Sequence, residues 1–352
     1  MADASSLGNP FTQQRELLAG QAIVLLDDRG VVELSGSDRL SYLDSLVSQD
    51  VAALVPGESA EALLLDPHGR IERSMRIVDD GSSTWLLVDE GQAPALAAFL
   101  DRMTFSKDAT ARDASIDFVT VGFFSTGLAD DEVTVTSATP HGVSLVWRDP
   151  WSAVVAGGWQ YASEDEHPAG QWNYAEALLD AHQVAALAAL PRVAGEALDA
   201  LRIAAWRPSL ATEVDALSLP HEVDWLRTAV HLAKGCYRGQ ETVAKVHNLG
   251  HPPRRLVLLH LDGTTNELPL PGAMISFDGV EVGNLTVAAR HFDDGPIALA
   301  VVKRSTPMNA TLTVEAPSGP QPATQVVIVP ADAGRAVDVP RMGKLGRVSR
   351  DA

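Results

Sequence analysis

The first fifty residues alternate between apolar runs and polar turns. Residues 23–27 and 31–34 are two short apolar runs, separated by a polar turn that contains Gly30. This pattern predicts a β-hairpin. Apolar residues then recur at helical spacing over residues 40–47, which predicts a helix with one buried face.

The next hundred residues combine strands with one clear helix. A second hairpin is predicted over residues 61–78, with its turn at 66–69, and a strand over residues 84–88 follows. Residues 93–103 have the apolar spacing of a helix. The chain then changes to short β-like runs, at residues 118–124, 133–135, 143–147 and 153–156.

Two segments in the second half of the chain are predicted to be helices. They cover residues 174–190, which are rich in Ala and Leu, and residues 196–205, and each is followed by a proline that stops a helix. After Gly250 the pattern becomes β-like. Apolar runs punctuated by Gly and Pro predict a small barrel or sandwich, with strands at residues 256–261, 274–277, 280–282, 285–289, 297–302, 311–314 and 325–329.

These elements predict an α+β fold rather than a doubly wound sheet, because regular βαβ alternation is missing. The predicted domains are a mixed region over residues 1–250 and a β-rich domain over residues 251–330. Residues 331–352 lack periodicity and are locally basic, so we expect a loose tail. Neither G-x-G-x-x-G after a strand nor G-x-x-x-x-G-K-[ST] occurs, which argues against a nucleotide-binding loop.

Composition restricts the expected partners of the chain. The 352 residues include 27 Lys and Arg against 46 Asp and Glu, a formal net charge of −19. Phosphate binding needs positive potential, so direct nucleic-acid binding and binding to anionic membranes are not expected. No apolar run is long enough to predict a membrane-spanning helix, and the polar start does not resemble a secretory signal. We therefore expect a cytoplasmic protein.

Cys236 is the single cysteine of the chain. One thiol forms neither an internal disulfide nor a four-cysteine metal site, and four thiolates are the usual ligands of an iron–sulfur cluster. His247 and His251 are four residues apart, but Gly250 and two prolines argue against a shared helix face. We therefore predict no metal site. A hydrolase is also disfavoured, since no G-x-S-x-G elbow occurs.

Cys236 lies in the segment with the most distinctive chemistry. Lys234 and Arg238 are each two residues away, and a neighbouring cation favours thiolate over thiol, which raises reactivity. Gly235 and Gly239 allow the backbone to approach another element or a ligand closely. The alternative is an inert, buried cysteine in a turn, because cysteine is commonly buried. The residue types alone leave both interpretations open.

Residues 234–241 resemble the K-G-C-Y-x-G-Q-E signature of the YgfZ family of folate-binding proteins, relatives of the glycine-cleavage T-protein (aminomethyltransferase). Other segments between about residues 20 and 305 are also similar to this family, among them the L-L-D-P-H-G-R-I run over residues 64–71. The signature is long and therefore specific. Its residues in this chain are Lys234, Gly235, Cys236, Tyr237, Gly239, Gln240 and Glu241.

The resemblance implies a T-protein-like ring of two α+β lobes and a C-terminal β-barrel around a central channel for tetrahydrofolate or a derivative. It aligns Glu213 with the family's pterin-binding glutamate, without a gap from residue 201. A carboxylate there can accept paired hydrogen bonds from a pterin. The alternative is a solvated loop acid. Trp206 replaces a family glycine in the same run, and we expect it to reshape the nearby channel wall.

The T-protein carries an acidic pair in its first hairpin, and an aspartate there is needed for aminomethyl transfer. Arg73 and Ser74 occupy the matching positions in this chain. Neither supplies the carboxylate that assists the transfer, which speaks against a glycine-cleavage enzyme. The resemblance instead implies a folate-dependent accessory factor for assembly or repair of iron–sulfur proteins, with effects on tRNA thiomodification. Cys236 would be its working thiol and Lys234 the electrostatic partner of that thiol.

The expected partners are folate and iron–sulfur client or assembly proteins. Two other hypotheses stay open. The first is a tetrahydrofolate-dependent aminomethyl- or methyltransferase, in which Glu72 or another acid replaces the acidic pair. The second is a pure interaction module in which Cys236 is structural.

An acidic chain can bind anionic folate if cations line the channel locally. Arginine suits this role, because its guanidinium offers two parallel hydrogen bonds to a carboxylate. The candidates are Arg202, Lys234, Arg238, Lys245, Arg254 and Arg255.

Overall fold

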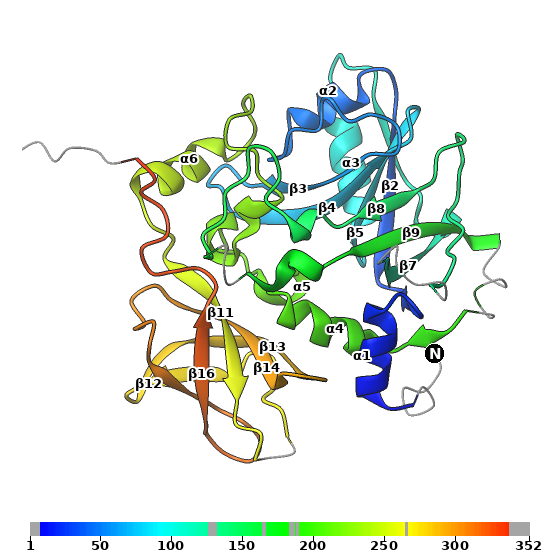
Figure 1. The fold of residues 1–352 in the computed structure, drawn as a ribbon. Helices are drawn as coiled ribbons and strands as arrows, with labels where there is room; N and C mark the ends of the chain where they lie inside the picture. Colours follow the sequence, from blue (N-terminus) through cyan, green and yellow to red (C-terminus); the bar gives the residue numbers. More distant parts are fainter. Residues whose placement is uncertain are drawn as a thin grey trace, which may run out of the picture.

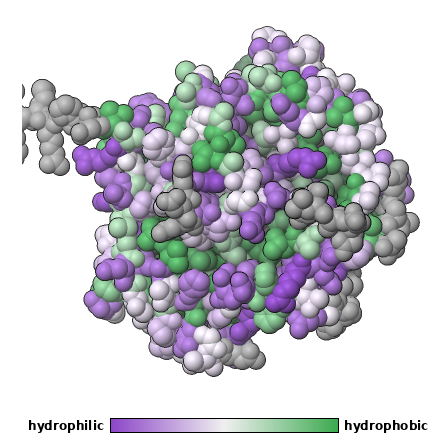
Figure 2. Space-filling view, in the orientation of Figure 1, coloured by the Kyte–Doolittle hydropathy of each residue, from purple (hydrophilic) through white to green (hydrophobic). Residues whose placement is uncertain are grey.

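A computed structural model describes residues 8–125, 132–163, 167–182, 187, 190–264 and 267–337. Two sheets occupy the upper part of the molecule in Figure 1, and a barrel lies at the lower left. Helix α4 (Gly195–Ala204) connects these parts, because it contacts the second sheet, the barrel and helix α1 (Pro10–Leu18). Hydrophilic and hydrophobic side chains are interspersed over the face drawn in Figure 2.

The first sheet has the strand order β3-β4-β5-β2-β6 and is antiparallel. Helices α2 (Arg39–Asp44) and α3 (Ala93–Met103) share a hydrophobic core with one face of it, and the other face packs into the central core of the molecule. The hairpin predicted over residues 61–78, the strand predicted after it and the helix predicted over residues 93–103 are confirmed. The strands are β2 (Arg29–Ser35), β3 (Ser59–Leu65), β4 (Ile71–Asp79), β5 (Ser83–Asp89) and β6 (Thr110–Asp113).

The second sheet has the order β10-β1-β7-β9-β8. Strand β1 pairs with β7 and β10, whereas β2 pairs with β5 and β6, so the hairpin predicted over residues 23–34 is wrong. The turn at Asp27 and Asp28 carries the chain from one sheet to the other. Two adjacent apolar runs do not reveal which distant strands they pair with. The strands are β1 (Ile23–Leu26), β7 (Phe118–Phe124), β8 (Val146–Arg148), β9 (Tyr174–Asp180) and β10 (Arg192–Val193).

Strand β9 corrects a second prediction, the helix over residues 174–190. It lies between β7 and β8, and its first six residues are all buried. Ala and Leu favour a helix in isolation, but burial on both faces of a sheet overrides that preference. Residues 183–186 and 188–189 of the predicted helix lie outside the described residues. The runs at residues 133–135 and 153–156 are not strands.

The C-terminal strands form a closed barrel in the order β11-β14-β13-β12-β15-β16, which confirms the predicted barrel. Alternate residues of β11, such as Val257 and Leu259, pack inside it against Ala298 and Ala300 of β14. The strands are β11 (Arg254–Leu261), β12 (Met274–Phe277), β13 (Val280–His291), β14 (Gly295–Lys303), β15 (Thr311–Val314) and β16 (Gln321–Val327).

Short helices fill the connections between the sheets and the barrel. Residues 331–337, part of the expected loose tail, contact helix α6, since Ala336 N donates to His247 O at 2.9 Å; residues 338–352 lie outside the described residues. No helix within the described ranges is long and apolar enough to cross a membrane. The connecting helices are η2 (Ser115–Asp117), η3 (Pro150–Ser152), η5 (Pro168–Gln171), α5 (Leu210–Glu213), η7 (Pro220–Val223), η8 (Trp225–Arg227) and α6 (Gln240–Leu249).

Candidate functional site

Lys234 fixes the signature loop (residues 234–241) to the end of helix α2 and the segment that follows it. Its side chain is 2% exposed, and Nζ donates to Asp44 Oδ1 at 2.8 Å and to the carbonyls of Asp44, Val47 and Gln49 at 2.7, 3.1 and 2.7 Å. Burial lowers the pKa of Lys234, although Asp44 opposes the shift. An ammonium has three protons, so these acceptors saturate it. Lys234 therefore anchors the loop, and none of its hydrogen bonds within the described residues goes to Cys236.

Gly239 and Gly69 bring the loop against the turn between β3 and β4. Both have left-handed backbones, with φ of 86° and 76°. A Cβ on Gly239 would lie 2.6 Å from Asp66 O, and a Cβ on Gly69 would lie 2.9 Å from Thr242 Cβ. The predicted close approach of backbones is therefore confirmed at Gly239. Gly235 differs, because an added Cβ there would have no heavy atom within 4 Å.

Tyr237 and Gln240 hold the loop from its other side. Tyr237 is buried, which raises the pKa of its hydroxyl, and Lys234 Nζ lies 5.7 Å from its ring centroid. Gln240 Nε2 donates to the carbonyls of Lys234 and Gly235 at 3.2 and 3.3 Å. Glu241 stands in the first turn of α6, where a negative charge complements the helix dipole. These contacts fix the loop on both sides of the cysteine.

Cys236 itself is exposed. The alternative of a buried cysteine is therefore wrong. Its neighbour Arg238 forms an ion pair with Glu72, with Nη1 3.0 Å from Oε2. The loop thus presents a free thiol at the surface while its flanking side chains are held.

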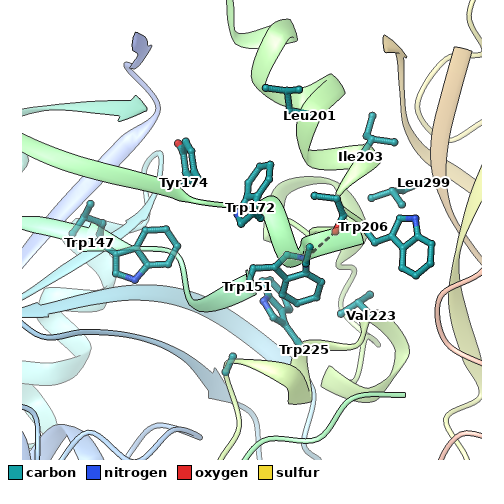
Figure 3. Close-up of a cluster of buried hydrophobic side chains, with 14 of the residues drawn as sticks. Trp147, Trp151, Trp172, Tyr174, Leu201, Ile203, Trp206, Val223, Trp225 and Leu299 are labelled. Atoms are coloured by element: carbon teal, nitrogen blue, oxygen red, sulfur yellow. Dashed lines mark hydrogen bonds between the residues drawn. The ribbon is translucent and has the colours of Figure 1, made fainter. Parts of the chain in front are cut away.

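A cavity of about 690 Å³ lies between the two sheets, helix α4 and residues 207–212. Cavities of about 300–1,000 Å³ accommodate drug-sized ligands. The aromatic side chains of the lining are Trp147, Trp172, Tyr174 and Trp225, and each of them is largely buried. Figure 3 shows the core around these lining side chains, including Trp151, whose Nε1 donates to Ala205 O at 2.9 Å.

Arg207 forms the centre of one charged group in this wall. Its Nε donates to Asp149 at 2.9 Å and its Nη2 to Glu61 at 2.6 Å. Burial raises the pKa of Asp149, although Arg207 opposes the shift. Arg207 is 4% exposed, and its Nη1 has no hydrogen-bond partner among the described residues. A buried donor of this kind requires an acceptor from water or a ligand.

Glu176 forms the centre of a second charged group. Its carboxylate lies 3.1 Å from Arg29 Nε and 3.2 Å from Arg76 Nε, and Asp89 contacts both arginines. Burial opposes ionisation of Glu176, but the two arginines outweigh it and lower the pKa of the carboxyl. The cavity wall therefore contains fixed charges of both signs.

Of the six cations predicted to line a channel, Arg202 alone is among the residues that line this cavity. Lys234 anchors the loop, Arg238 pairs with Glu72, Lys245 is exposed on α6, and the other two lie at the barrel. There Arg254 pairs with Asp215 and Glu222, and Arg255 donates to Thr306 O and Gln325 Oε1. The cavity cations that sequence reasoning missed are Arg29, Arg76 and Arg207.

Strand β4 connects the cavity to the signature loop. Ser74, at one position of the missing acidic pair, is buried and lines the cavity. Arg73, at the other, donates to Gln92 at 3.3 Å. Glu72 is the extra residue of a β-bulge, since Leu64 faces Arg73 and the next residue of β3 faces Ile71. One strand thus contacts the loop at Glu72 and the cavity at Ser74.

Glu213 is buried at the end of α5, so the alternative of a solvated loop acid is wrong. Its Oε2 accepts from Arg202 Nη1 at 2.8 Å, from Ser209 N at 2.8 Å and from Thr212 Oγ1 at 2.7 Å. Its Oε1 accepts from Thr286 Oγ1 of the barrel at 2.6 Å. Glu213 is not among the residues that line the large cavity, but Arg202, which it holds, is.

Trp206, at the position of the family glycine, has a left-handed backbone. It follows α4 with φ of 57°, the left-handed position at which helices commonly end in glycine. Its indole is buried and lies 5.3 Å from the His167 ring. The expectation that it reshapes the channel wall is wrong, because Trp206 packs into the core and is not among the cavity-lining residues.

Two sheets and a closed barrel, with a cavity between the sheets, define a T-protein-like fold. The solved structure of glycine cleavage system aminomethyltransferase T from Bartonella henselae matches with a TM-score of 0.70 at 18% identity, over 93% of this chain and 90% of that one. The predicted α+β class and T-protein-like architecture are confirmed.

Curated proteins of two kinds are similar to this chain in sequence. The chain is 26% identical over 295 residues to "Iron-sulfur cluster assembly factor IBA57 homolog, mitochondrial" of Mycosarcoma maydis, which covers 77% of this chain but 64% of that protein's length. It is 25% identical over 292 residues to "tRNA-modifying protein YgfZ" of Escherichia coli O157:H7, over 80% and 84% of the two chains. No family model matches the chain. The resemblance to the YgfZ family predicted from the signature is confirmed by these relatives.

Proposed function

We propose that this chain is a folate-binding accessory factor for the assembly or repair of iron–sulfur proteins, with downstream effects on tRNA thiomodification. The observation that carries the proposal is the signature loop, in which buried contacts of Lys234, Tyr237 and Gln240 leave Cys236 exposed. Support comes from the similarity to proteins named for iron–sulfur cluster assembly and for tRNA modification.

The large cavity fits a reduced folate. Its volume suits a ligand of that size, and tryptophans contribute to its wall. The unpaired Nη1 of Arg207 offers a hydrogen bond to a carbonyl of the ring. Glu213 would act through Arg202, because their 2.8 Å ion pair holds the guanidinium at the cavity wall. Folate bound there would be held by burial in the cavity and by these donors.

Cys236 would meet client or assembly proteins directly, because an exposed thiol in a fixed loop is accessible to a second macromolecule. One thiol does not complete a cluster site. Any iron–sulfur cluster contacted here would therefore be bound chiefly by ligands from the partner.

A folate titration tests the ligand. Tetrahydrofolate should quench the fluorescence of the cavity tryptophans saturably in the wild-type protein. Glu213→Gln should weaken binding about tenfold, since it releases Arg202. Glu222→Gln is the matched control, because Glu222 is an equally buried acid paired with Arg254 outside the cavity. Absence of saturable quenching in the wild type would refute the folate proposal.

Complementation tests the thiol. Cys236→Ser changes one exposed atom, so folding should be unaffected. In cells that lack their own YgfZ-like protein, the wild-type chain should restore iron–sulfur enzyme activity and thiolated tRNA, and Cys236→Ser should restore little of either. Full restoration by Cys236→Ser would show that the thiol is dispensable.

A further inference from the structure

The positively charged side chains that line the cavity are all largely buried. Its four cations are Arg29, Arg76, Arg202 and Arg207, whose side chains are between 5% and 13% exposed. Each of them pairs with at least one carboxylate. The positive charges of the cavity are therefore deep and already neutralised.

The exposed charged side chains of the same lining are all acidic. Asp27 and Asp28 form the turn between β1 and β2, Glu90 follows β5, and Asp199 projects from α4. Asp27 and Glu90 form no hydrogen bond or ion pair through their side chains within the described residues. Asp28 and Asp199 lie 3.4 and 3.5 Å from Arg29 and Arg202, which other carboxylates share. Because these four acids both line the cavity and reach solvent, they form the rim of its mouth.

A second observation points to a ligand inside. Arg207 Nη1 is buried in the wall without a partner among the described residues, and the acids beside it, Glu61 and Asp149, already accept from Nη2 and Nε. Two carboxylates around one guanidinium leave a net negative surrounding. The free N–H therefore suits a neutral acceptor, such as a ring carbonyl, better than an anion.

We infer that this cavity selects among folates by the charge of the tail, taking monoglutamyl forms in preference to polyglutamyl forms. The inference rests on the proposed folate binding. Aromatic rings gain from burial against the tryptophans, whereas glutamyl carboxylates stay hydrated and are left at the mouth. There they face the acidic rim, and each further glutamate adds one more repelled charge.

The size of the effect follows from Coulomb's law in water. Charges about 10 Å apart interact weakly, and salt at about 0.1 M screens them at that distance. Several rim acids act on each carboxylate, so we expect about a twofold loss of affinity per added glutamate at low salt. The loss should nearly vanish at high salt.

The test measures dissociation constants for tetrahydrofolate with one, three and five glutamates, by tryptophan quenching of the full chain in 20 mM and 300 mM salt. The wild type should rank them in the order one, three, five at low salt. Asp27→Asn with Glu90→Gln should remove the ranking, because both acids are unpaired rim residues. Asp278→Asn with Glu315→Gln, two exposed acids of the barrel, is the matched control and should keep it.

The outcomes separate the two proposals. If polyglutamyl forms bind the wild type as tightly as the monoglutamyl form, or more tightly, the selection by tail charge is overturned while folate binding stands. The same holds if the ranking persists in the rim variant. If no folate binds saturably, the proposed function itself fails.

Discussion

Gly239→Ala should loosen the signature loop, whereas Gly235→Ala in the same loop should be tolerated. The two glycines are four residues apart and differ in two respects that decide the outcome, the backbone conformation and the space for a Cβ. Gly239 has a φ of 86°, and its added Cβ would meet Asp66 O at 2.6 Å and Gly69 Cα at 2.9 Å. Gly235 has no positive φ, and nothing lies within 4 Å of its Cβ position.

The expected loss at Gly239 is the sum of two contributions to the free energy of unfolding. A left-handed backbone costs a residue with a Cβ about 1–2 kcal/mol. Overpacking costs about 1–3 kcal/mol, and the atoms met here are backbone atoms that cannot rotate away. Together they predict a destabilisation of about 2–5 kcal/mol. Alanine at Gly235 should change stability by less than about 1 kcal/mol.

Urea unfolding, followed by tryptophan fluorescence, measures both variants. A second readout is the rate at which an alkylating reagent modifies Cys236 under native conditions, which should change for Gly239→Ala and stay at the wild-type value for Gly235→Ala. Equal effects of the two substitutions, in either direction, would refute the assignment of the close backbone contact to Gly239.

Three further predictions concern anchors and buried groups. Lys234→Met should destabilise the fold by about 3 kcal/mol in urea, because it leaves carbonyls and Asp44 without their donor, whereas the exposed Lys245→Met should shift it by less than about 0.5 kcal/mol. Trp206→Gly relieves a left-handed backbone but empties a buried site, so calorimetry should show a net loss of about 2–3 kcal/mol. Burial lowers the pKa of His221 to about 3. Between about pH 6.5 and 3 this histidine therefore binds a proton in the unfolded chain but not in the folded chain. The contribution of His221 to stability should therefore fall by about 1.4 kcal/mol per pH unit between 6.5 and 3, and His221→Gln should reduce the overall slope by that amount when urea unfolding is repeated across this range.

Local patterns predicted the parts of the fold that depend on local pairing. The β3–β4 hairpin and helix α3 were predictable, because their partners are near in sequence. The pairing of β1 with β7 and β10 was not predictable, since the sequence of an apolar strand does not specify a distant partner. In β9, the helical preference of Ala and Leu was overridden by burial between two strands.

The candidate site divides in the same way. The signature loop is contiguous, so its cysteine and its glycines could be singled out from the sequence. The contacts of Lys234 could not, because its acceptors are mostly backbone carbonyls of a segment far away in sequence. The group around Arg207 joins Glu61 and Asp149 from separate strands and loops, and only the folded chain brings them together.

The crossing of the chain at Asp27 and Asp28 has a consequence for how the molecule is made. Strand β1 leaves the ribosome well before its partners Phe118–Phe124 and Arg192–Val193. Until then an apolar strand has no neighbours, a condition that exposes it to misassociation. The sheet that contains β1 is therefore completed only after β10 has emerged, and the two lobes cannot be released as independent halves by cutting the chain between them.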